Sequence, residues 1–353
     1  MSGHEETVVH HDIGEAPEGA ERAIAKPAAP EAKATLQTRH IIFVVMLALA
    51  LVLPAFTKNF VVFQLTQTMV YAIAIVGLNL LTGFNGQFSL GHSAFYAVGA
   101  YTAAIMMEHM GVSYVWTLPV AGVICFILGF LFGLPALRLD GVYLALATFA
   151  LAAATPQILK LSPLEHWTGG VQGIVITKPD APFGLKLNQD QWLYYFTLIV
   201  GVILYLAAKN LVTSRTGRAL MAIRDNPIAA RSMGVNTSLY KASAFGLSAL
   251  YTGIAGALGA IIVQFVAPDS FTLTLSIGFL VGLVVGGVGW LPGALFGGAF
   301  LLFVPNIAEN ISKGLSGAVY GLLLIAIIYV MPSGLAGFVA WAIDRVRPTA
   351  ARR

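Results

Sequence analysis

Long apolar runs alternate with short polar connections along most of this chain. A helix needs about 20 mostly apolar residues to cross the hydrocarbon core of a bilayer. About ten runs approach that length, so the pattern predicts an all-α, polytopic membrane helix bundle with about ten transmembrane helices. The expected spans lie near 41–57, 67–83, 92–107, 114–134, 141–159, 192–211, 242–264, 270–289, 291–308 and 315–331.

The eighth and ninth runs follow each other closely. The turn between them would be Gly289-Trp290-Leu291-Pro292-Gly293, and Pro and Gly together are typical of a break between helices. Joining the two runs would leave an odd number of spans and put the C-terminal arginines outside. We therefore expect two separate helices.

Lysine and arginine are distributed unevenly among the connections. Cytoplasmic segments of membrane proteins carry more of them than external segments do. With the N-terminus in the cytoplasm, ten spans leave 15 of the 20 basic residues inside and five outside. This split predicts that both termini are cytoplasmic.

The composition agrees with a membrane protein. Hydrophobic residues make up 58% of the 353 residues and charged residues 10%, with a mean hydropathy of +0.81. A soluble domain averages about 25% charged residues, so this chain needs membrane lipid around it. The net charge of +4 is too small to indicate nucleic acid as a partner. A single cysteine, Cys125, allows no internal disulfide and no cysteine-based metal site.

The two ends of the chain differ from the middle. Residues 1–38 are rich in Ala, Pro and Glu and contain no aromatic residue, which predicts a disordered cytoplasmic tail. The tail is acidic and does not resemble a cleavable signal peptide. The transmembrane domain is expected at 39–345, followed by a basic tail at 346–353.

The spans contain no Asp, Glu, Lys or Arg near their centres. Proton-driven transporters usually need ionisable groups at that depth, so their absence argues against proton coupling. A sodium-coupled transporter, which can use backbone carbonyls, stays open. The chain has no Gly-x-x-x-x-Gly-Lys-Ser/Thr phosphate-binding loop, so ATP would have to bind to another chain. No connection is large enough for a catalytic domain, and we do not expect an enzyme.

Two connections are long: residues 160–191, predicted outside, and residues 212–241, predicted inside with five basic residues and one acidic residue. In the second, Asn226 suits an N-cap, Pro227 the first helical position and Gly234 the position after the helix. Two short helices are therefore expected. The second would carry small and apolar residues, as a knob that docks into a partner's groove does. A connector that lies on the membrane surface is the alternative, and the pattern leaves both open.

The same stretch resembles the coupling loop of a known family. Residues 214–234 carry the Arg-Ala-x-x-Ala-Ile-Arg-Asp-Asn-x-x-Ala-Ala pattern of the branched-chain amino acid permeases among ATP-binding-cassette (ABC) importers. Three further segments resemble that family: Gly77–Phe95, Thr168–Ile174 and Gly286–Gly289 with Pro292–Ala294. The resemblance covers about residues 40–340. It does not fix the substrate, because relatives in the wider group import urea, short amides or sugars.

The resemblance implies a permease subunit of a high-affinity leucine, isoleucine and valine importer in the bacterial inner membrane. Its partners would be a second homologous permease, two cytoplasmic ATPases that bind ATP and Mg, and a periplasmic substrate-binding protein. It implies no cofactor in this chain. The residues that it assigns to ATPase coupling are Arg218, Ala219, Arg224, Asp225, Ala229, Ala230 and Gly234. The rival functions are an ABC permease for urea or short amides, and a secondary transporter or channel that needs no ATPase.

Polar residues also cluster at the end of the second span, together with several glycines. Irregular backbone at membrane depth is tolerated where it is buried in protein or lines a cavity, so this block could line or gate the transport route. A tight turn whose amides satisfy free backbone groups is the alternative, and it is favoured for two of the residues, Asn85 and Gln87. A packed histidine is the alternative for His92. The candidate pathway residues are Asn79, Asn85, Gln87, Ser89 and His92.

Glycines recur in the later spans. Small residues let membrane helices approach closely, so these positions predict tight helix packing. They are Gly246, Gly253, Gly256, Gly259, Gly278, Gly282, Gly286, Gly293, Gly297 and Gly298.

Overall fold

The computed structural model describes residues 48–139, 141–182, 187–311, 315–330 and 334–337. The chain divides into two compact units, residues 1–53 and residues 54–353. Of the first unit, the structure describes only residues 48–53, which are helical. The predicted tails at 1–38 and 346–353, and residues 41–47 of the first predicted span, lie outside the described residues.

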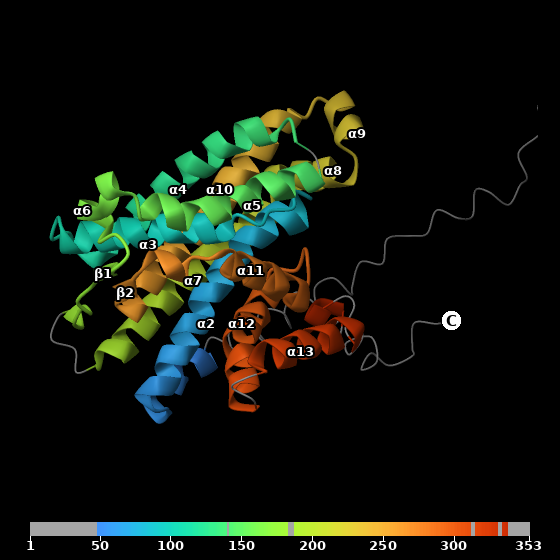
Figure 1. The fold of residues 1–353 in the computed structure, drawn as a ribbon. Coiled ribbons are helices and arrows are strands. Elements are labelled where there is room, and N and C mark those ends of the chain that lie inside the picture. Colours follow the sequence, from blue (N-terminus) through green and yellow to red (C-terminus); the bar gives the residue numbers. More distant parts are fainter. Residues whose placement is uncertain (1–47, 140, 183–186, 312–314, 331–333, 338–353) are drawn as a thin grey trace, which may run out of the picture. The chain divides into compact units, whose positions relative to one another are not determined.

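The second unit is almost entirely helical, as predicted (Figure 1). A single pair of two-residue strands is the exception in the described part of the chain. The elements in chain order are α2 (Asn59–Leu78), η2 (Asn79–Phe84), α3 (His92–Glu108), α4 (Tyr114–Ala136), α5 (Val142–Leu159), η3 (Ser162–Leu164), α6 (Glu165–Thr168), β1 (Ile174–Val175), α7 (Gln189–Thr213), α8 (Arg215–Asp225), α9 (Pro227–Ser232), α10 (Thr237–Val263), β2 (Phe265–Val266), η5 (Pro268–Ser270), α11 (Leu273–Gly286), α12 (Gly293–Ile311) and α13 (Ser316–Val330).

A helix coincides with each predicted apolar run from the second to the tenth. Within the described residues, six helical segments are long and apolar enough to cross a membrane. The predicted break between the eighth and ninth runs is confirmed, because α11 ends at Gly286 and α12 begins at Gly293. The six segments are 59–84, 114–136, 142–159, 189–213, 237–263 and 268–286.

Two helices begin earlier than their apolar runs. The α2 helix begins at Asn59 rather than near 67, and α10 begins at Thr237 rather than 242. For α10 the reason is local, since the Asn236 side chain caps the helix by accepting a hydrogen bond from Leu239 N at 3.1 Å. Hydrophobicity marks the part of a helix that lipid or protein covers, whereas a cap marks where the helix starts.

The α10 helix is the centre of the bundle. It packs against α4, α3 and α2, and most of its residues are buried. The α12 helix packs against α2, α11 and α13, which brings the last three helices together beside α2 (Figure 1). By contrast, α4, α5 and α7 each keep a row of large apolar side chains exposed. Such faces suit contact with lipid.

Glycine allows the closest helix contacts, as predicted. A Cβ atom on Gly256 would lie 2.0 Å from the Tyr96 carbonyl oxygen, and one on Gly99 would lie 2.0 Å from the Gly253 carbonyl oxygen. The backbones of α3 and α10 therefore touch. At each of the ten predicted packing glycines, an added Cβ would lie 3.0 Å or less from another residue.

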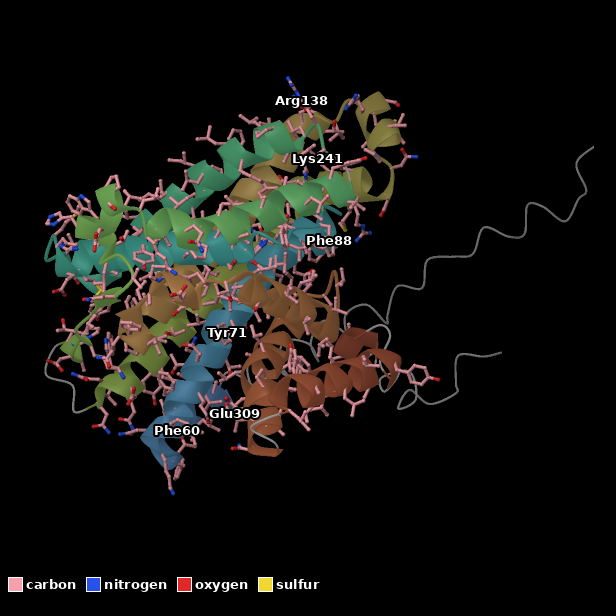
Figure 2. The ribbon with its side chains drawn as sticks, in the orientation of Figure 1. Phe60, Tyr71, Phe88, Arg138, Lys241 and Glu309 are labelled. Atoms are coloured by element: carbon pink, nitrogen blue, oxygen red, sulfur yellow. The ribbon has the colours of Figure 1, made fainter. Side chains whose placement is uncertain are left out.

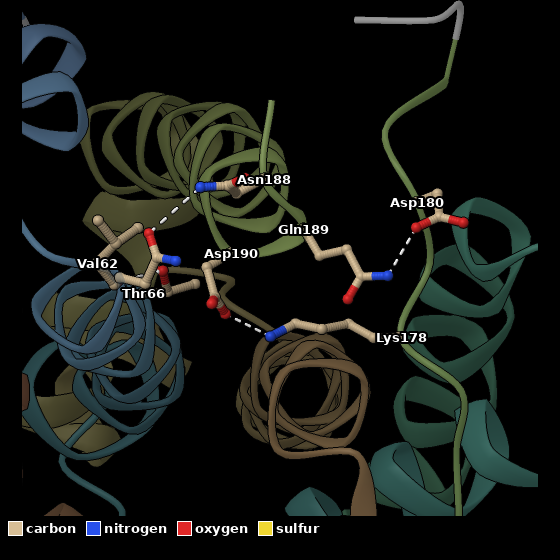
Figure 3. Close-up of polar contacts among 8 residues, drawn as sticks. Val62, Thr66, Lys178, Asp180, Asn188, Gln189 and Asp190 are labelled. Atoms are coloured by element: carbon tan, nitrogen blue, oxygen red, sulfur yellow. Dashed lines mark hydrogen bonds and ion pairs between the residues drawn. The ribbon is translucent and has the colours of Figure 1, made fainter. Parts of the chain in front are cut away.

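The predicted outer loop, residues 160–191, is folded against the ends of the helices. Its strand β1 pairs antiparallel with β2, which directly follows α10, and Ile174 lies opposite Val266. Lys160 forms an ion pair with Asp269 at 2.6 Å. Close to the start of α7, Lys178 is paired with Asp190 and Gln189 donates to Asp180 (Figure 3).

Candidate functional site

The loop between α7 and α10 consists of two short capped helices. The Ser214 side chain caps α8 by accepting from Thr216 N at 3.1 Å, and Asn226 caps α9 by accepting from Ile228 N at 3.1 Å and Ala229 N at 3.0 Å. Pro227 is the first residue of α9. After the helix, Gly234 adopts φ +83°, which favours glycine. The predicted pair of helices and their caps are confirmed.

These two helices have one buried and one exposed apolar side. Leu220, Ile223 and Ala230 face the protein and are buried. Ile228 in α9 is 80% exposed and Met233, its C-cap residue, is 85% exposed, so large apolar side chains here point away from the rest of the chain. Of the predicted coupling residues, Ala230 is buried, Ala219 is half-buried, and the others are exposed: Arg218, Arg224, Asp225, Ala229 and Gly234.

The Asn226 cap gives a first testable expectation. Asn226→Ala should destabilise α9 by about 1 kcal/mol, because two backbone N–H groups lose their acceptor. Hydrogen exchange at the Ile228 and Ala229 amides should then become roughly fivefold faster. Asn226→Ser, which keeps a capping oxygen, should exchange nearly as slowly as the wild type. Equal exchange in Asn226→Ala and the wild type would contradict the role of the cap.

Arg224 joins this loop to the end of the second helix. Its Nη1 donates to the Gly83 carbonyl oxygen at 2.9 Å, and its Nε and Nη2 each lie 2.9 Å from Asp225 Oδ1. Its aliphatic stem packs over Gly86, where an added Cβ would lie 2.8 Å from Arg224 Cγ. One side chain thus contacts both η2 and the turn that follows.

That turn is held by its own polar groups. Asn85 Nδ2 donates to Gln87 Oε1 at 2.6 Å, and the Thr82 hydroxyl donates to the Gln87 carbonyl at 3.0 Å. Gly86 adopts φ +74°. Asn85 and Gln87 are buried, and Asn85 Oδ1 has no partner among the described residues. The geometry agrees with the tight turn expected for these two residues.

Ser89 and His92 connect the turn to α10. His92 Nδ1 lies 3.2 Å from Ser89 Oγ, and His92 Nε2 lies 2.7 Å from Ser248 Oγ. All three side chains are 1% exposed. A histidine buried between two hydroxyls is positioned firmly, because moving it would leave polar atoms without partners.

Three more hydrogen bonds tie the start of α3 to other helices. Leu90 N donates to Thr148 Oγ1 of α5 at 2.9 Å. Ser93 N donates to Ser276 Oγ of α11 at 2.8 Å, and the Ser276 hydroxyl donates to Ser93 Oγ at 2.8 Å. Sequence analysis does not single out Ser248 or Ser276. A hydroxyl within an apolar run was their only signal.

Asn79 bridges to the turn between α11 and α12. Its Oδ1 accepts from Gly289 N at 2.8 Å, and its Nδ2 donates to the Trp290 carbonyl at 3.1 Å. The structure thus brings together all five candidate pathway residues, and all five are buried and bonded within the protein. This arrangement is that of a packed junction, and a direct role in lining the route stays a prediction.

Comparison with known proteins identifies the family. A family model described as the permease component of branched-chain amino acid transport systems matches residues 60–328. The chain belongs to this permease family. The match covers α2 to most of α13 and agrees with the resemblance carried by the sequence motifs.

Individual relatives of the permease are transport proteins. It is 32% identical over 320 residues to the high-affinity branched-chain amino acid transport system permease protein LivM of Escherichia coli K12, a match that covers 84% of this chain and 75% of LivM. It is 27% identical to the high-affinity branched-chain amino acid transport system permease protein LivH of Salmonella typhimurium, a match that covers 76% of this chain and 91% of LivH. It is also 27% identical to the autoinducer 2 import system permease protein LsrC of Escherichia coli, with coverage of 82% and 86%. No solved structure matches the chain.

The permease is a multi-pass membrane protein, on the basis of its family and its apolar helices. Basic residues gather at the end of the bundle where α8 and α9 lie. Figure 2 shows Arg138 and Lys241 at that end, whereas Phe60 and Glu309 lie toward the opposite end. The α8–α9 loop adds Arg215, Arg218, Arg224 and Arg231.

Proposed function

We propose that this chain is the permease subunit of an ABC importer that carries branched-chain amino acids across the bacterial inner membrane. The observation that carries the proposal is the 32% identity to LivM over 84% of the chain. The family match at 60–328 and the weaker similarity to LivH support it. The chain itself would perform no catalysis.

The topology that we propose has about ten membrane spans and both termini in the cytoplasm. The gathering of Arg138, Lys241 and the arginines of α8 and α9 at one end supports a cytoplasmic location for that end. The segment 160–191 then faces the periplasm, where a substrate-binding protein would dock.

The α8–α9 loop is, in this proposal, the contact for an ATPase subunit. Ile228 and Met233 are the supporting observation, because large apolar side chains exposed at a basic, polar end of the molecule are typical of a docking surface. Two cytoplasmic ATPases would bind ATP and Mg, and a second homologous permease would complete the passage. Closure of the ATPases would move the loop and switch access from one side of the membrane to the other.

Uptake measurements test the proposal. Cells that lack this chain should lose uptake of labelled leucine, and the wild-type gene should restore it. Arg224→Glu or Asp225→Lys should not restore it, because either change reverses a charge in the loop that would receive the ATPase motion. Arg138→Glu, an exposed charge reversal at the same end but outside the loop, should restore most of the uptake.

Urea and a short amide serve as comparison solutes. The similarity to LsrC, an autoinducer 2 import permease, shows that relatives of this chain are named for different solutes. Unchanged leucine uptake with lost urea or amide uptake would keep the importer architecture and overturn the substrate. Uptake that persists after deletion of the partner ATPases would overturn the ABC mechanism in favour of a secondary transporter or channel.

A further inference from the structure

The α8 helix packs on the bundle through the buried side chains of Leu220 and Ile223, and one polar side chain, Arg224, joins it to the turn after η2. Arg224 donates to the Gly83 carbonyl and covers Gly86. Gly83 lies near the C-terminal end of η2, where helix carbonyls have no partner in the helix itself. A guanidinium there satisfies one of these carbonyls and suits the negative end of the helix dipole. Asp225 holds the other nitrogens of the same guanidinium at 2.9 Å.

Arg224 contacts the segment of residues 79–93. Other residues of this segment form hydrogen bonds to four different parts of the bundle. Asn79 holds the α11–α12 turn, Leu90 holds α5, His92 holds α10 and Ser93 holds α11. Two of these bonds, His92 to Ser248 and Ser93 to Ser276, are buried. Polar bonds of that kind resist being broken one at a time, because each broken bond leaves a buried group unsatisfied.

We propose that residues 79–93 form a relay segment, which transmits displacement of the α8–α9 loop to α5, α10 and α11, with Arg224 as the positioning residue that couples the loop to it. This inference rests on the proposed function. The segment is short and its polar side chains are buried. It connects the loop to helices that are distant in the sequence. A shift at Gly83 would therefore move the three helix contacts together, as a contiguous packed network transmits displacement.

The relay role differs from the predicted pathway role of the same block. A residue that lines a route must present a polar atom to the solute. The side-chain nitrogens of Asn79 and His92 and the Ser89 hydroxyl are instead engaged with the protein. Variants of the relay should therefore change how transport depends on ATP hydrolysis, and should leave the apparent affinity for the solute unchanged.

Gly86→Ala is the sharpest variant. At φ +74° an alanine is strained, and its Cβ would lie 2.8 Å from Arg224 Cγ and 3.3 Å from Arg224 Cβ, so the Arg224 side chain has to move from its place over the turn. The experiment uses the complete importer, with both permeases, the ATPases and the binding protein, in proteoliposomes. It measures leucine transported per ATP hydrolysed. We expect this ratio to fall about tenfold, while ATP hydrolysis, assembly of the complex and KM for leucine stay at wild-type values.

Gly141→Ala is the matched control. Gly141 also adopts a positive φ, +55°, but nothing lies within 4 Å of an added Cβ, so this variant carries the backbone strain without the contact to Arg224. It should keep the wild-type ratio.

A second variant, Arg224→Lys, keeps the positive charge. A lysine ammonium cannot donate to the Gly83 carbonyl and bind Asp225 at the same time through one planar group, as the guanidinium does. This variant should lower the ratio as well, whereas Arg215→Lys, on the same helix, should not.

The outcomes separate the two proposals. Equal ratios in Gly86→Ala and Gly141→Ala, or parallel losses of hydrolysis and transport in Gly86→Ala, would overturn the relay. A raised KM with an unchanged ratio would overturn it in favour of the pathway role. A wild-type complex that transports urea or an amide instead of leucine would overturn the proposed substrate, and the same ratio measured with that solute would still decide the relay. Wild-type transport without ATP would overturn both.

Discussion

Gly256→Leu should prevent recovery of the folded permease. An added Cβ at this position would lie 2.0 Å from the Tyr96 carbonyl oxygen and 3.1 Å from Ala100 N. Both atoms belong to the backbone of α3, so no side chain can rotate out of the way. Forcing α3 and α10 apart would cost about 3 kcal/mol or more, and α10 is the helix that most of the bundle packs against. The yield of monodisperse protein in mild detergent should fall to roughly a tenth of the wild type or less.

Gly321→Leu is the control for this prediction. Gly321 is also a glycine within an apolar helix, α13, but nothing lies within 4 Å of an added Cβ. Its yield should match that of the wild type. Gly256→Ala should give an intermediate yield, because a single methyl group already collides with α3. A wild-type yield of Gly256→Leu would mean that α3 and α10 do not touch as the structure has them.

The same glycines illustrate what the sequence could predict. Gly253, Gly256 and Gly259 recur along an apolar run, and close packing is the general reason for small residues there. The helices and the α9 cap were predictable for a similar reason. Each depends on a signal contained within a few neighbouring residues: an apolar run for α4, or Asn226 followed by Pro227 for α9.

Contacts between distant residues were not predictable. Asn79 bonds to Gly289, 210 positions away, and no local pattern in either segment names the other. The β1–β2 pair was not predictable for the same reason. Each strand has only two residues, and the strands form because Ile174 pairs with Val266, which is distant in the sequence. The π-helical turn at η2 likewise continues an ordinary apolar helix, without a proline to mark it.

The candidate site was found in part. Polar residues in an apolar run pointed to the block that contains Asn79, Ser89 and His92. The pattern alone could not show whether these residues line the transport route or form a packed junction, because both arrangements place polar atoms at membrane depth. The hydrogen-bond partners favour the packed junction, and a role in lining the route stays a prediction. Ser248 and Ser276 are single hydroxyls on other helices, and only the fold brings them to the block.

His92→Leu should destabilise the permease by about 1–3 kcal/mol, because it leaves the buried Ser248 hydroxyl without a partner and leaves Ser89 Oγ with only the Gly91 N–H. Ser89 and Ser248 are each 1% exposed, so water cannot readily replace the imidazole. Unfolding of the detergent-solubilised protein by increasing denaturant measures the change in free energy. His166→Leu is the control, since His166 lies on the short helix α6 and is exposed. It should change the free energy of unfolding by less than about 0.5 kcal/mol.

A double-mutant cycle with Ser248→Ala shows whether the His92–Ser248 bond carries this effect. Once Ser248 is alanine, removing His92 breaks only its bond to Ser89, whose Oγ still accepts from Gly91 N. The two substitutions together should therefore cost less than the sum of their separate costs. The expected coupling is about 1–2 kcal/mol. Additive costs would mean that His92 contributes through its ring contact with Phe95, whose centroid lies 6.3 Å away. In that case the link between the start of α3 and α10 would depend on packing, and an aromatic residue at position 92 would preserve it better than leucine.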